Sequence, residues 1–289
     1  MEVTLMGKLR AYMELSRPKN ALMSVLGALT GWVNSTGALD WRLLLTCAIP
    51  PLILMAGNAV NDYFDAEVDA INKPHRPIPA GKISRREAMN LYVAFSMIGV
   101  ALSSLLGALE FLIAAIFSSA WYIYARWLKG TGIPGNILVS LGVAFTLIFG
   151  SLAAGNPTIK VILFSSIAFT SNLAREFVKT IEDLPGDRAQ GIRTLAVRIG
   201  VRRTGFLASI TLSAVMILTL IPALMGLVGL PYILLSVISS LPPLTLAAIR
   251  CCQDDLERRA GSVSSLIKVS MFLGLLGMLA DPIVNAWRV

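Results

Sequence analysis

Histidine and cysteine are scarce in this chain of 289 residues. His75 is the only histidine and lies in a loop between two prolines, which argues against a Ser-His-Asp triad and against a His-ligated zinc site. The three cysteines are Cys47, Cys251 and Cys252. They show no metal-ligand spacing, and two adjacent cysteines rarely form a disulfide with each other. The chemistry of this protein must therefore come from other side chains.

Charged residues are also few, because they make up 15% of the chain whereas 55% is hydrophobic. The mean hydropathy of +0.71 is outside the range of a water-soluble domain with a polar surface. A helix needs roughly 20 apolar residues to cross the bilayer. Apolar runs of this kind occur near 16–33, 43–64, 88–107, 109–126, 136–154, 158–180, 204–225, 230–249 and 264–284. The sequence predicts an all-α membrane protein of one domain, residues 1–289, with about nine transmembrane helices around a central cavity.

The distribution of Lys and Arg predicts the orientation in the membrane. With nine helices, 21 of the 25 Lys and Arg residues fall in the N-terminal segment and in the loops on that same side. Positive residues are retained in the cytoplasm, so we expect a multi-pass cell-membrane protein whose N-terminus and active-site mouth are cytoplasmic. The net charge of +8 then favours anionic lipid headgroups and diphosphates as partners and argues against nucleic acid.

Acidic residues are concentrated in two short segments at the cytoplasmic ends of predicted helices. In the first segment, Asn61, Asp65 and Asp69 are spaced i, i+4 and i+8. Asn58 and Asp62, together with Asp65 and Asp69, follow the spacing i, i+4, i+7 and i+11. Both spacings place side chains on one face of a helix, so their oxygen atoms are expected to converge.

The second acidic segment repeats part of this pattern 118 residues later, with Glu176, Asp183 and Asp187 at i, i+7 and i+11. The repeat indicates two related halves, each with one Asp-rich motif. Pro185 and Gly186 are expected to end the helix, so that Asp187 extends from a loop.

Carboxylates near the hydrocarbon boundary are costly unless a cation compensates them, and hard oxygen ligands suit Mg²⁺. Basic side chains close to both acidic segments would bind the outer oxygens of a phosphate group, which a bare cation site does not require. A magnesium diphosphate is therefore the expected ligand. These basic residues are Lys73, Arg76, Lys82, Lys179, Arg188 and Arg193.

The two acidic motifs resemble those of the UbiA superfamily of intramembrane prenyltransferases. Residues 61–69 (NDYFDAEVD) are similar to the family pattern NDxxDxxxD, and residues 70–81 continue the likeness, with Ala80 where Ser is usual. Residues 175–179 (REFVK), 182–188 (EDLPGDR) and 194–197 (TLAV) form the second signature. Weaker matches are Arg17-Pro18-Lys19-Asn20 and Lys129.

The resemblance implies Mg²⁺-dependent transfer of a prenyl group from its diphosphate to a lipid-like acceptor. The second motif most resembles the branch that adds a geranylgeranyl group to the hydroxyl of geranylgeranylglyceryl phosphate in archaeal ether-lipid synthesis. The implied metal ligands are Asn58, Asn61, Asp65, Asp69, Glu176, Asp183 and Asp187. The implied catalytic residues are Asp62, Asp69, Tyr122 and Tyr124, with the two tyrosines facing an allylic cation. The implied substrate-binding residues are Arg17, Lys19, Asn20, Lys73, Arg76, Lys129, Lys179, Arg188 and Arg193.

Three alternatives stay open from the sequence. An aromatic acceptor, as in quinone or chlorophyll-type pathways, would use the same first motif. Intramembrane carboxylates also occur in secondary transporters, although transport sites usually lie near the bilayer midplane. Tyr122 and Tyr124 are equally compatible with an aromatic belt at the membrane interface.

Overall fold

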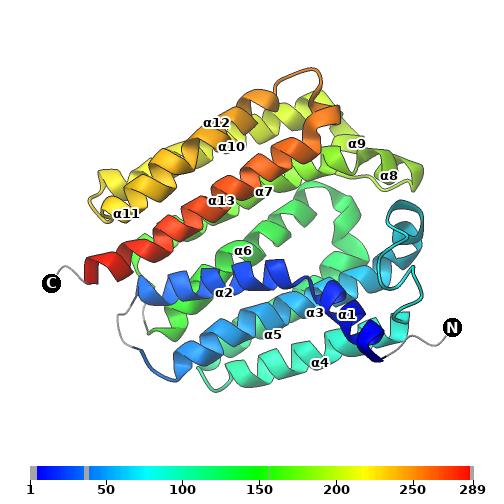
Figure 1. Cartoon of the computed structure of the whole chain (residues 1–289), viewed down its shortest axis with the longest axis horizontal. Helices are drawn as coiled ribbons and strands as arrows, with labels where there is room; N and C mark the ends of the chain where they lie inside the picture. Colours follow the sequence, from blue (N-terminus) through cyan, green and yellow to red (C-terminus); the bar gives the residue numbers. More distant parts are fainter. Residues whose placement is uncertain (1–4, 36–38, 156, 287–289) are drawn as a thin grey trace. The chain divides into compact units, whose positions relative to one another are not determined.

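The computed structural model describes residues 5–35, 39–155 and 157–286, and these ranges contain helices and no strand (Figure 1). An all-α fold was expected, and the structure confirms it. The helices of the N-terminal part are α1 (Leu5–Ser16), α2 (Pro18–Val33), α3 (Arg42–Asn72), α4 (Arg85–Ser103), α5 (Ala108–Ile123), η1 (Tyr124–Leu128) and η2 (Lys129–Thr131). The remaining helices are α6 (Ile133–Ala153), α7 (Ile159–Glu182), α8 (Leu184–Ala189), α9 (Leu195–Ile199), α10 (Val201–Leu224), α11 (Leu230–Tyr232), η3 (Ile233–Ser239), α12 (Leu241–Arg250) and α13 (Leu256–Ala286).

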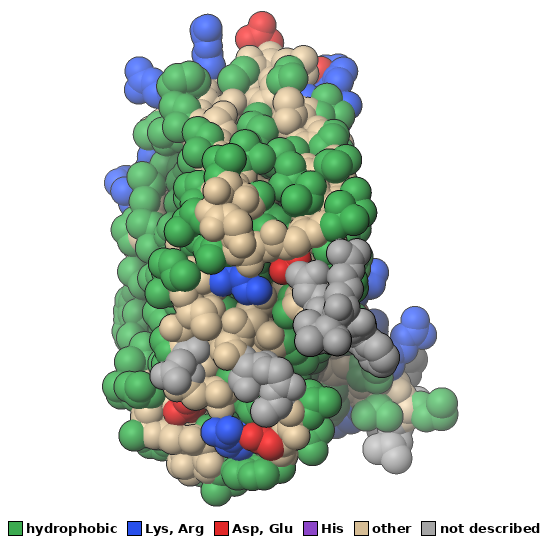
Figure 2. Space-filling model, turned by 90° about the vertical axis from the view of Figure 1, so that its left-hand side faces the viewer, with side chains coloured by type: hydrophobic (Ala, Val, Ile, Leu, Met, Phe, Trp, Pro, Cys, Tyr) green, Lys and Arg blue, Asp and Glu red, His purple; other side chains and the backbone are tan. Residues whose placement is uncertain are grey.

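Seven helical segments in the described ranges are long and apolar enough to cross a membrane, so the predicted count of nine is not confirmed. The two expected spans that miss this criterion are α2 and α4. Helix α2 has only 16 residues, and α4 begins with the charged sequence Arg85-Arg86-Glu87. Hydrophobic side chains cover most of the face shown in Figure 2, as expected for a surface in contact with lipid.

The chain divides into two compact units. The first unit comprises Met1–Ala28 and Leu39–Leu128, and in it α3 packs against α1, α4 and α5. The second unit comprises Leu29–Ala38 and Lys129–Val289, and in it α7 packs against α6, α10 and α13. The first acidic segment therefore belongs to the first unit and the second acidic segment to the second unit.

A sharp backbone break separates α1 from α2, where the sequence predicted one helix from residue 16 onward. Arg17 adopts a positive φ of 51°, a conformation that costs a residue with a side chain roughly 1–2 kcal/mol. Its carbonyl oxygen accepts hydrogen bonds from the backbone N–H groups of Asn20 (2.9 Å) and Ala21 (3.2 Å), which starts α2. Pro18 is well suited to the first helical position, which needs no N–H donor. Because of this break, the Arg17 side chain extends toward Asn58 and Asp62 of α3.

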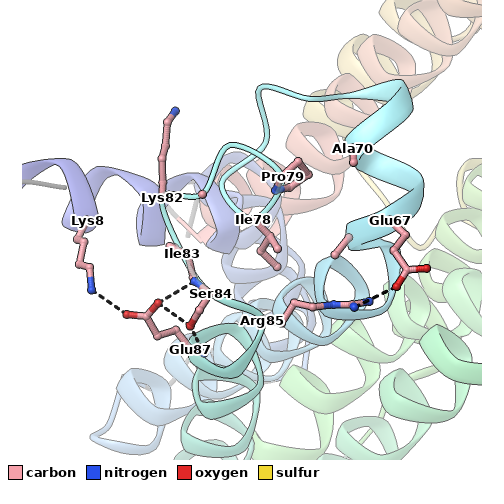
Figure 3. Close-up of a pocket in the computed structure, with 12 residues that line it drawn as sticks. Lys8, Glu67, Ala70, Ile78, Pro79, Lys82, Ile83, Ser84, Arg85 and Glu87 are labelled. Atoms are coloured by element: carbon pink, nitrogen blue, oxygen red, sulfur yellow. Dashed lines mark hydrogen bonds and ion pairs between the residues drawn. The ribbon is translucent and has the colours of Figure 1, made fainter. Parts of the chain in front are cut away.

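Helix α4 starts with a capping box that also holds α1. The Ser84 hydroxyl accepts from the backbone N–H of Glu87, and a Glu87 carboxylate oxygen accepts from the Ser84 N–H at 2.7 Å (Figure 3). Lys8 and Tyr12 of α1 donate to the other oxygen of Glu87 at 3.0 and 3.3 Å. The bonds from Ser84 and Lys8 lower the pKa of Glu87 to about 2.

We expect Glu87→Ala to lower the melting temperature of the purified protein and Glu87→Gln to lower it less, because Gln keeps the acceptor for Ser84. A carboxyl whose pKa is depressed in the folded state stabilises the fold above its unfolded pKa and loses that contribution as pH falls toward about 2. The difference between wild type and Glu87→Gln should therefore be largest near neutral pH and shrink on acidification. The partial solvent exposure of Glu87 keeps this difference small. An equal difference at pH 7 and pH 3 would contradict the assignment.

Gly31 lies where the end of α2 contacts α6, within the second unit. A Cβ atom at this position would stand 1.9 Å from the carbonyl oxygen of Leu147, which no side chain can occupy without movement of the backbone. We expect Gly31→Ala to destabilise the protein by about 1–3 kcal/mol, the usual cost of overpacking. Gly274→Ala in α13 is the matched control, because nothing lies within 4 Å of its Cβ position. Thermal unfolding in detergent measures both, and equal melting temperatures would show that this contact is not tight.

Candidate active site

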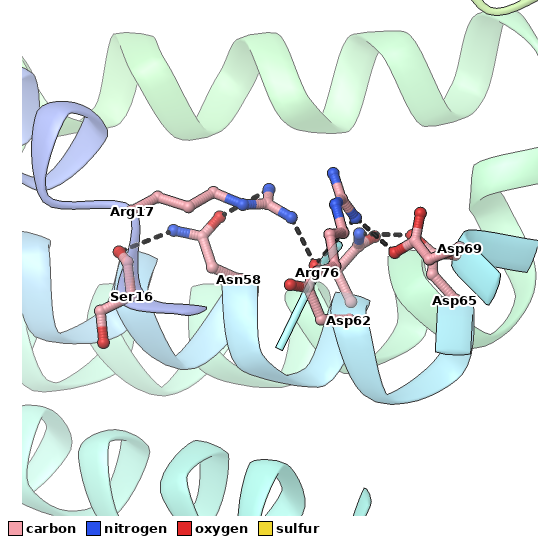
Figure 4. Close-up of polar contacts among 8 residues, drawn as sticks. Ser16, Arg17, Asn58, Asp62, Asp65, Asp69 and Arg76 are labelled. Atoms are coloured by element: carbon pink, nitrogen blue, oxygen red, sulfur yellow. Dashed lines mark hydrogen bonds and ion pairs between the residues drawn. The ribbon is translucent and has the colours of Figure 1, made fainter. Parts of the chain in front are cut away.

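Helix α3 presents the first acidic segment on one face, as the spacing predicts. Asn58, Asp62, Asp65 and Asp69 are each at most 7% exposed (Figure 4). Burial of three carboxylates on one helix face is costly unless positive groups or hydrogen-bond donors compensate them. The compensating groups in the first unit are two guanidinium groups from outside α3.

Arg17 and Arg76 supply these guanidinium groups. Arg17 donates to Asn58 Oδ1 at 3.2 Å and to a carboxylate oxygen of Asp62. Arg76, which follows α3 in the loop to α4, donates to Asp62 at 3.3 Å and to Asp69. Asp62 is thus the shared partner of both arginines, which were predicted as substrate-binding residues.

Two further hydrogen bonds fix the face of α3. The Asn61 amide nitrogen donates to Asp65 Oδ2 at 2.7 Å, which links two side chains four residues apart on the helix. Asn58 donates to the carbonyl oxygen of Ser16 at 3.3 Å and thereby ties the end of α1 to α3. Glu67 is off the acidic pattern, exposed, and paired with Arg85, as expected for a solvated neighbour.

The other predicted substrate-binding residues of the first unit lie nearby in the chain without a place in this cluster. Lys19 and Asn20 are exposed in the first turn of α2, and Lys73 is half-buried directly after α3. Their assignment to substrate stays a prediction.

The second acidic segment spans the end of α7 and the short helix α8. Glu176 is buried and accepts from Arg175 at 3.0 Å, Asp183 caps the end of α7, and Asp187 lies inside α8. Helix α7 ends at Glu182, close to Pro185 as expected, but the expectation that Asp187 extends from a loop is wrong. Proline is favoured in the first turn of a helix, and here it starts α8.

Asp187 is half-buried and accepts a hydrogen bond from the Thr194 hydroxyl at 2.9 Å. Burial raises the pKa of the Asp187 carboxyl above its ordinary value, against the opposing effects of Thr194, Lys129 and Lys179. Lys129 and Lys179 were predicted as substrate-binding residues, and the structure brings both within electrostatic reach of Asp187. Arg188 and Arg193, predicted for the same role, are exposed.

Sequence reasoning missed Arg175 and Thr194 as partners of the acidic residues. Both stand inside the quoted second signature, Arg175 directly before Glu176 and Thr194 seven residues after Asp187. The sequence motif therefore contains both residues, but only the fold shows which carboxylate each of them contacts.

The donor set of both clusters fits Mg²⁺. Within the described ranges, no three His, Cys, Asp or Glu side chains are grouped so that they could hold a metal ion by themselves. Mg²⁺ usually keeps several waters and binds one or two carboxylates together with phosphate oxygens, and it does not need a complete protein cage. Asn61 and Asp65 offer one amide oxygen and one carboxylate for such a site, and the Asn61 amide nitrogen donates to Asp65 in this structure.

The tyrosines predicted to face an allylic cation belong to an aromatic cluster of the first unit. The Tyr122 ring lies 5.5 Å from Phe64, 6.0 Å from Tyr92 and 6.1 Å from Trp127, measured between ring centroids. Tyr124 lies 6.3 Å from Trp121. A catalytic role for Tyr122 and Tyr124 stays a prediction, because these contacts are equally those of packed rings.

An open cavity of about 560 Å³ lies between α1, the end of α3 and the loop to α4 (Figure 3). Its lining includes the apolar residues Ile78, Pro79 and Ile83 and the basic residues Lys8 and Lys82. Lys82 was predicted to contact phosphate oxygens, but none of the predicted metal ligands or catalytic residues lines the cavity. The cavity is therefore separate from the acidic cluster on α3.

The structure has apolar helices long enough to span a membrane, and one of them, α3, carries buried carboxylates that face two guanidinium groups. Residues 21–276 match the model of the UbiA prenyltransferase family, and the chain belongs to this family. It is therefore a prenyltransferase, so the transporter alternative is discarded.

Two curated relatives are named digeranylgeranylglyceryl phosphate synthase. The protein of Korarchaeum cryptofilum is 69% identical over 96% of this chain and 99% of its own length. The protein of Methanopyrus kandleri is 38% identical over 94% of this chain and 99% of its own length.

Solved structures share the fold. A structure of digeranylgeranylglyceryl phosphate synthase is 28% identical, with a TM-score of 0.79 over 96% of this chain and 99% of that chain. A UbiA homolog from Archaeoglobus fulgidus bound to GPP and Mg²⁺ is 17% identical, with a TM-score of 0.63 over 91% of this chain and 99% of that chain.

Proposed function

We propose that this prenyltransferase transfers a geranylgeranyl group from geranylgeranyl diphosphate to the free hydroxyl of geranylgeranylglyceryl phosphate. The observation that carries the proposal is the 69% identity to the Korarchaeum cryptofilum relative over nearly the full length of both chains. The reaction breaks the bond between C1 of the prenyl chain and the diphosphate oxygen. It forms an ether bond to the acceptor oxygen and releases diphosphate and the hydroxyl proton.

We propose that Asn61, Asp65 and Asp69 of the first cluster, and Asp183 and Asp187 of the second, hold Mg²⁺, with Asn58 and Glu176 as additional ligands. When bound, the metal neutralises charge that develops on the leaving diphosphate. The carboxylate and amide oxygens on α3 support this assignment, as does the Mg²⁺ and GPP complex of the Archaeoglobus fulgidus homolog.

The basic residues complete the electrostatic role of the site in this proposal. Arg17 and Arg76 already stand on the carboxylate face, and each guanidinium has N–H groups left for phosphate oxygens after its bonds to Asp62. Lys129 and Lys179 serve the second cluster in the same way. Arg76, Lys129 and Lys179 are oriented before the substrate binds and stabilise the leaving diphosphate without reorganisation cost, whereas Arg17 is assigned to the phosphate of the acceptor.

The proposal also assigns the remaining catalytic tasks and the topology. Asp62 and Asp69 are positioned near the reacting groups, and Tyr122 or Tyr124 would face the allylic cation in a cavity closed to water. The N-terminus and the mouth of the site are cytoplasmic in this proposal, because with nine spans 21 of the 25 Lys and Arg residues belong to the segments on that side.

An acceptor panel tests the proposal. The purified protein in lipid nanodiscs receives Mg²⁺ and geranylgeranyl diphosphate, together with geranylgeranylglyceryl phosphate, hydroxybenzoate, dihydroxynaphthoate or chlorophyllide. Release of inorganic diphosphate and mass spectrometry of the product measure turnover. We expect product with the glyceryl ether phosphate alone. Turnover confined to an aromatic acceptor would overturn the assignment and favour a quinone or chlorophyll-type pathway.

A further inference from the structure

Helix α1 has two apolar faces, of which only one is covered by protein. Ala11 and Leu15 are 1% and 0% exposed and pack in a small core with α3 and α4. Met6, Leu9 and Met13 are 84%, 62% and 58% exposed. Their spacing of i, i+3 and i+7 places them in one stripe on the side of the helix away from that core. A stripe of large apolar side chains of this kind is unfavourable in water.

The length and charge of α1 decide what covers this stripe. At 1.5 Å per residue, 12 residues reach about 18 Å, well short of the roughly 30 Å hydrocarbon core. Arg10 and Glu14 are exposed on the same helix, which also argues against a transmembrane position. The next helix, the apolar α2, follows after a single residue, and α3 is the first segment long and apolar enough to span, so α1 precedes the membrane-spanning part of the chain.

We propose that α1 is an interfacial helix that lies in the plane of the membrane surface. Its outward stripe of Met6, Leu9 and Met13 is buried among lipid headgroups and the upper acyl carbons. Such helices combine a short apolar face with charged side chains that remain at headgroup level. Arg10 borders the stripe and complements anionic headgroups, while Lys8 on the inner side holds the helix to Glu87.

This position connects the membrane surface with the candidate active site. Helix α1 ends at Ser16, whose carbonyl oxygen accepts from Asn58, and the next residue is Arg17 with its guanidinium on Asn58 and Asp62. A helix fixed on one side by lipid and on the other by α3 and Glu87 restricts the movement of Arg17. This consequence rests on the proposed function, whereas the position of α1 does not.

Depth-dependent quenching tests the position of α1 independently of activity. In a background with Cys47, Cys251 and Cys252 replaced by alanine, single variants Leu9→Cys and Met13→Cys are labelled with an environment-sensitive fluorophore. The labelled protein is placed in nanodiscs that contain nitroxide lipids with the spin label either near the headgroup or near the bilayer centre. Asp254→Cys, at an exposed loop residue, is the matched control.

We expect the shallow nitroxide to quench both α1 labels at least twofold more strongly than the deep nitroxide, and neither nitroxide to quench the Asp254→Cys label appreciably. Quenching of the α1 labels no greater than that of the control would overturn the proposal. Stronger quenching by the deep nitroxide would overturn it as well, because α1 would then insert into the bilayer. Unchanged turnover of the labelled variants shows that the fold is intact.

Discussion

Asp65→Ala is expected to reduce prenyl transfer at least a thousandfold. Asp65 is buried on the acidic face of α3 and receives a hydrogen bond from Asn61, so its carboxylate is held in place before any ligand binds. Removal of one hard oxygen ligand leaves the remaining carboxylates to repel each other and the diphosphate charge uncompensated. These effects are typically worth several kcal/mol of activation free energy, and about 4 kcal/mol corresponds to a thousandfold change in rate. Steady-state release of diphosphate measures the loss.

Asp183→Ala should have an effect of the same size if both acidic segments serve one diphosphate, as proposed. Asp183 caps the end of α7 and belongs to the second unit, so a joint effect would link the two units functionally. The measurement is the kcat of the variant over a titration of Mg²⁺. A kcat of Asp183→Ala equal to that of wild type at every Mg²⁺ concentration would contradict a shared site, because the loss of a ligand must weaken Mg²⁺ binding or lower kcat.

Two controls separate this loss from misfolding and from general charge effects. Asp254→Ala removes an exposed carboxylate between α12 and α13 and should leave turnover unchanged. Asp65→Asn keeps the shape and one oxygen while removing the charge, so it should fold like wild type and still lose most activity. Equal melting temperatures for Asp65→Asn and wild type confirm that the deficit is chemical.

The sequence was sufficient for the acidic face of α3 because helical periodicity is a local property. Residues spaced i, i+4, i+7 and i+11 share a face whatever packs around them, and Asn58, Asp62, Asp65 and Asp69 do so. The class of fold followed in the same way from the long apolar runs.

The partners of these residues depend on contacts between distant parts of the chain, and there periodicity gives no information. Arg17 was expected at the start of the first span, but its contacts with Asn58 and Asp62 depend on a positive φ. Few residues with a side chain adopt this conformation, so local propensity argues against it. Helix α1 was missed because its two apolar faces do not form a run long enough to count as a span.

Arg17→Ala is expected to raise the KM for the phosphorylated glyceryl acceptor roughly ten- to a hundredfold, while the KM for the prenyl diphosphate stays nearly unchanged. The proposed acceptor carries its own phosphate, so the site must hold a second anion beside the diphosphate. A charge-assisted hydrogen bond contributes about 1.5–3 kcal/mol, which gives this range of KM values. Loss of Arg17 leaves Asp62 with Arg76, which still contacts both Asp62 and Asp69 and can serve the diphosphate.

Alanine is the informative substitution at this position because it keeps a Cβ atom. The positive φ then carries about the same conformational cost in both proteins, so changes in KM report the loss of the guanidinium. Arg17→Lys retains the charge without the planar pair of donors and should fall between wild type and Arg17→Ala. Lys19→Ala, at an exposed neighbour, should change the acceptor KM less.

If Arg17→Ala weakened donor and acceptor equally, or if the dephosphorylated acceptor reacted as well as the phosphorylated one, the second-anion proposal would be wrong. A neutral or aromatic acceptor would then regain support.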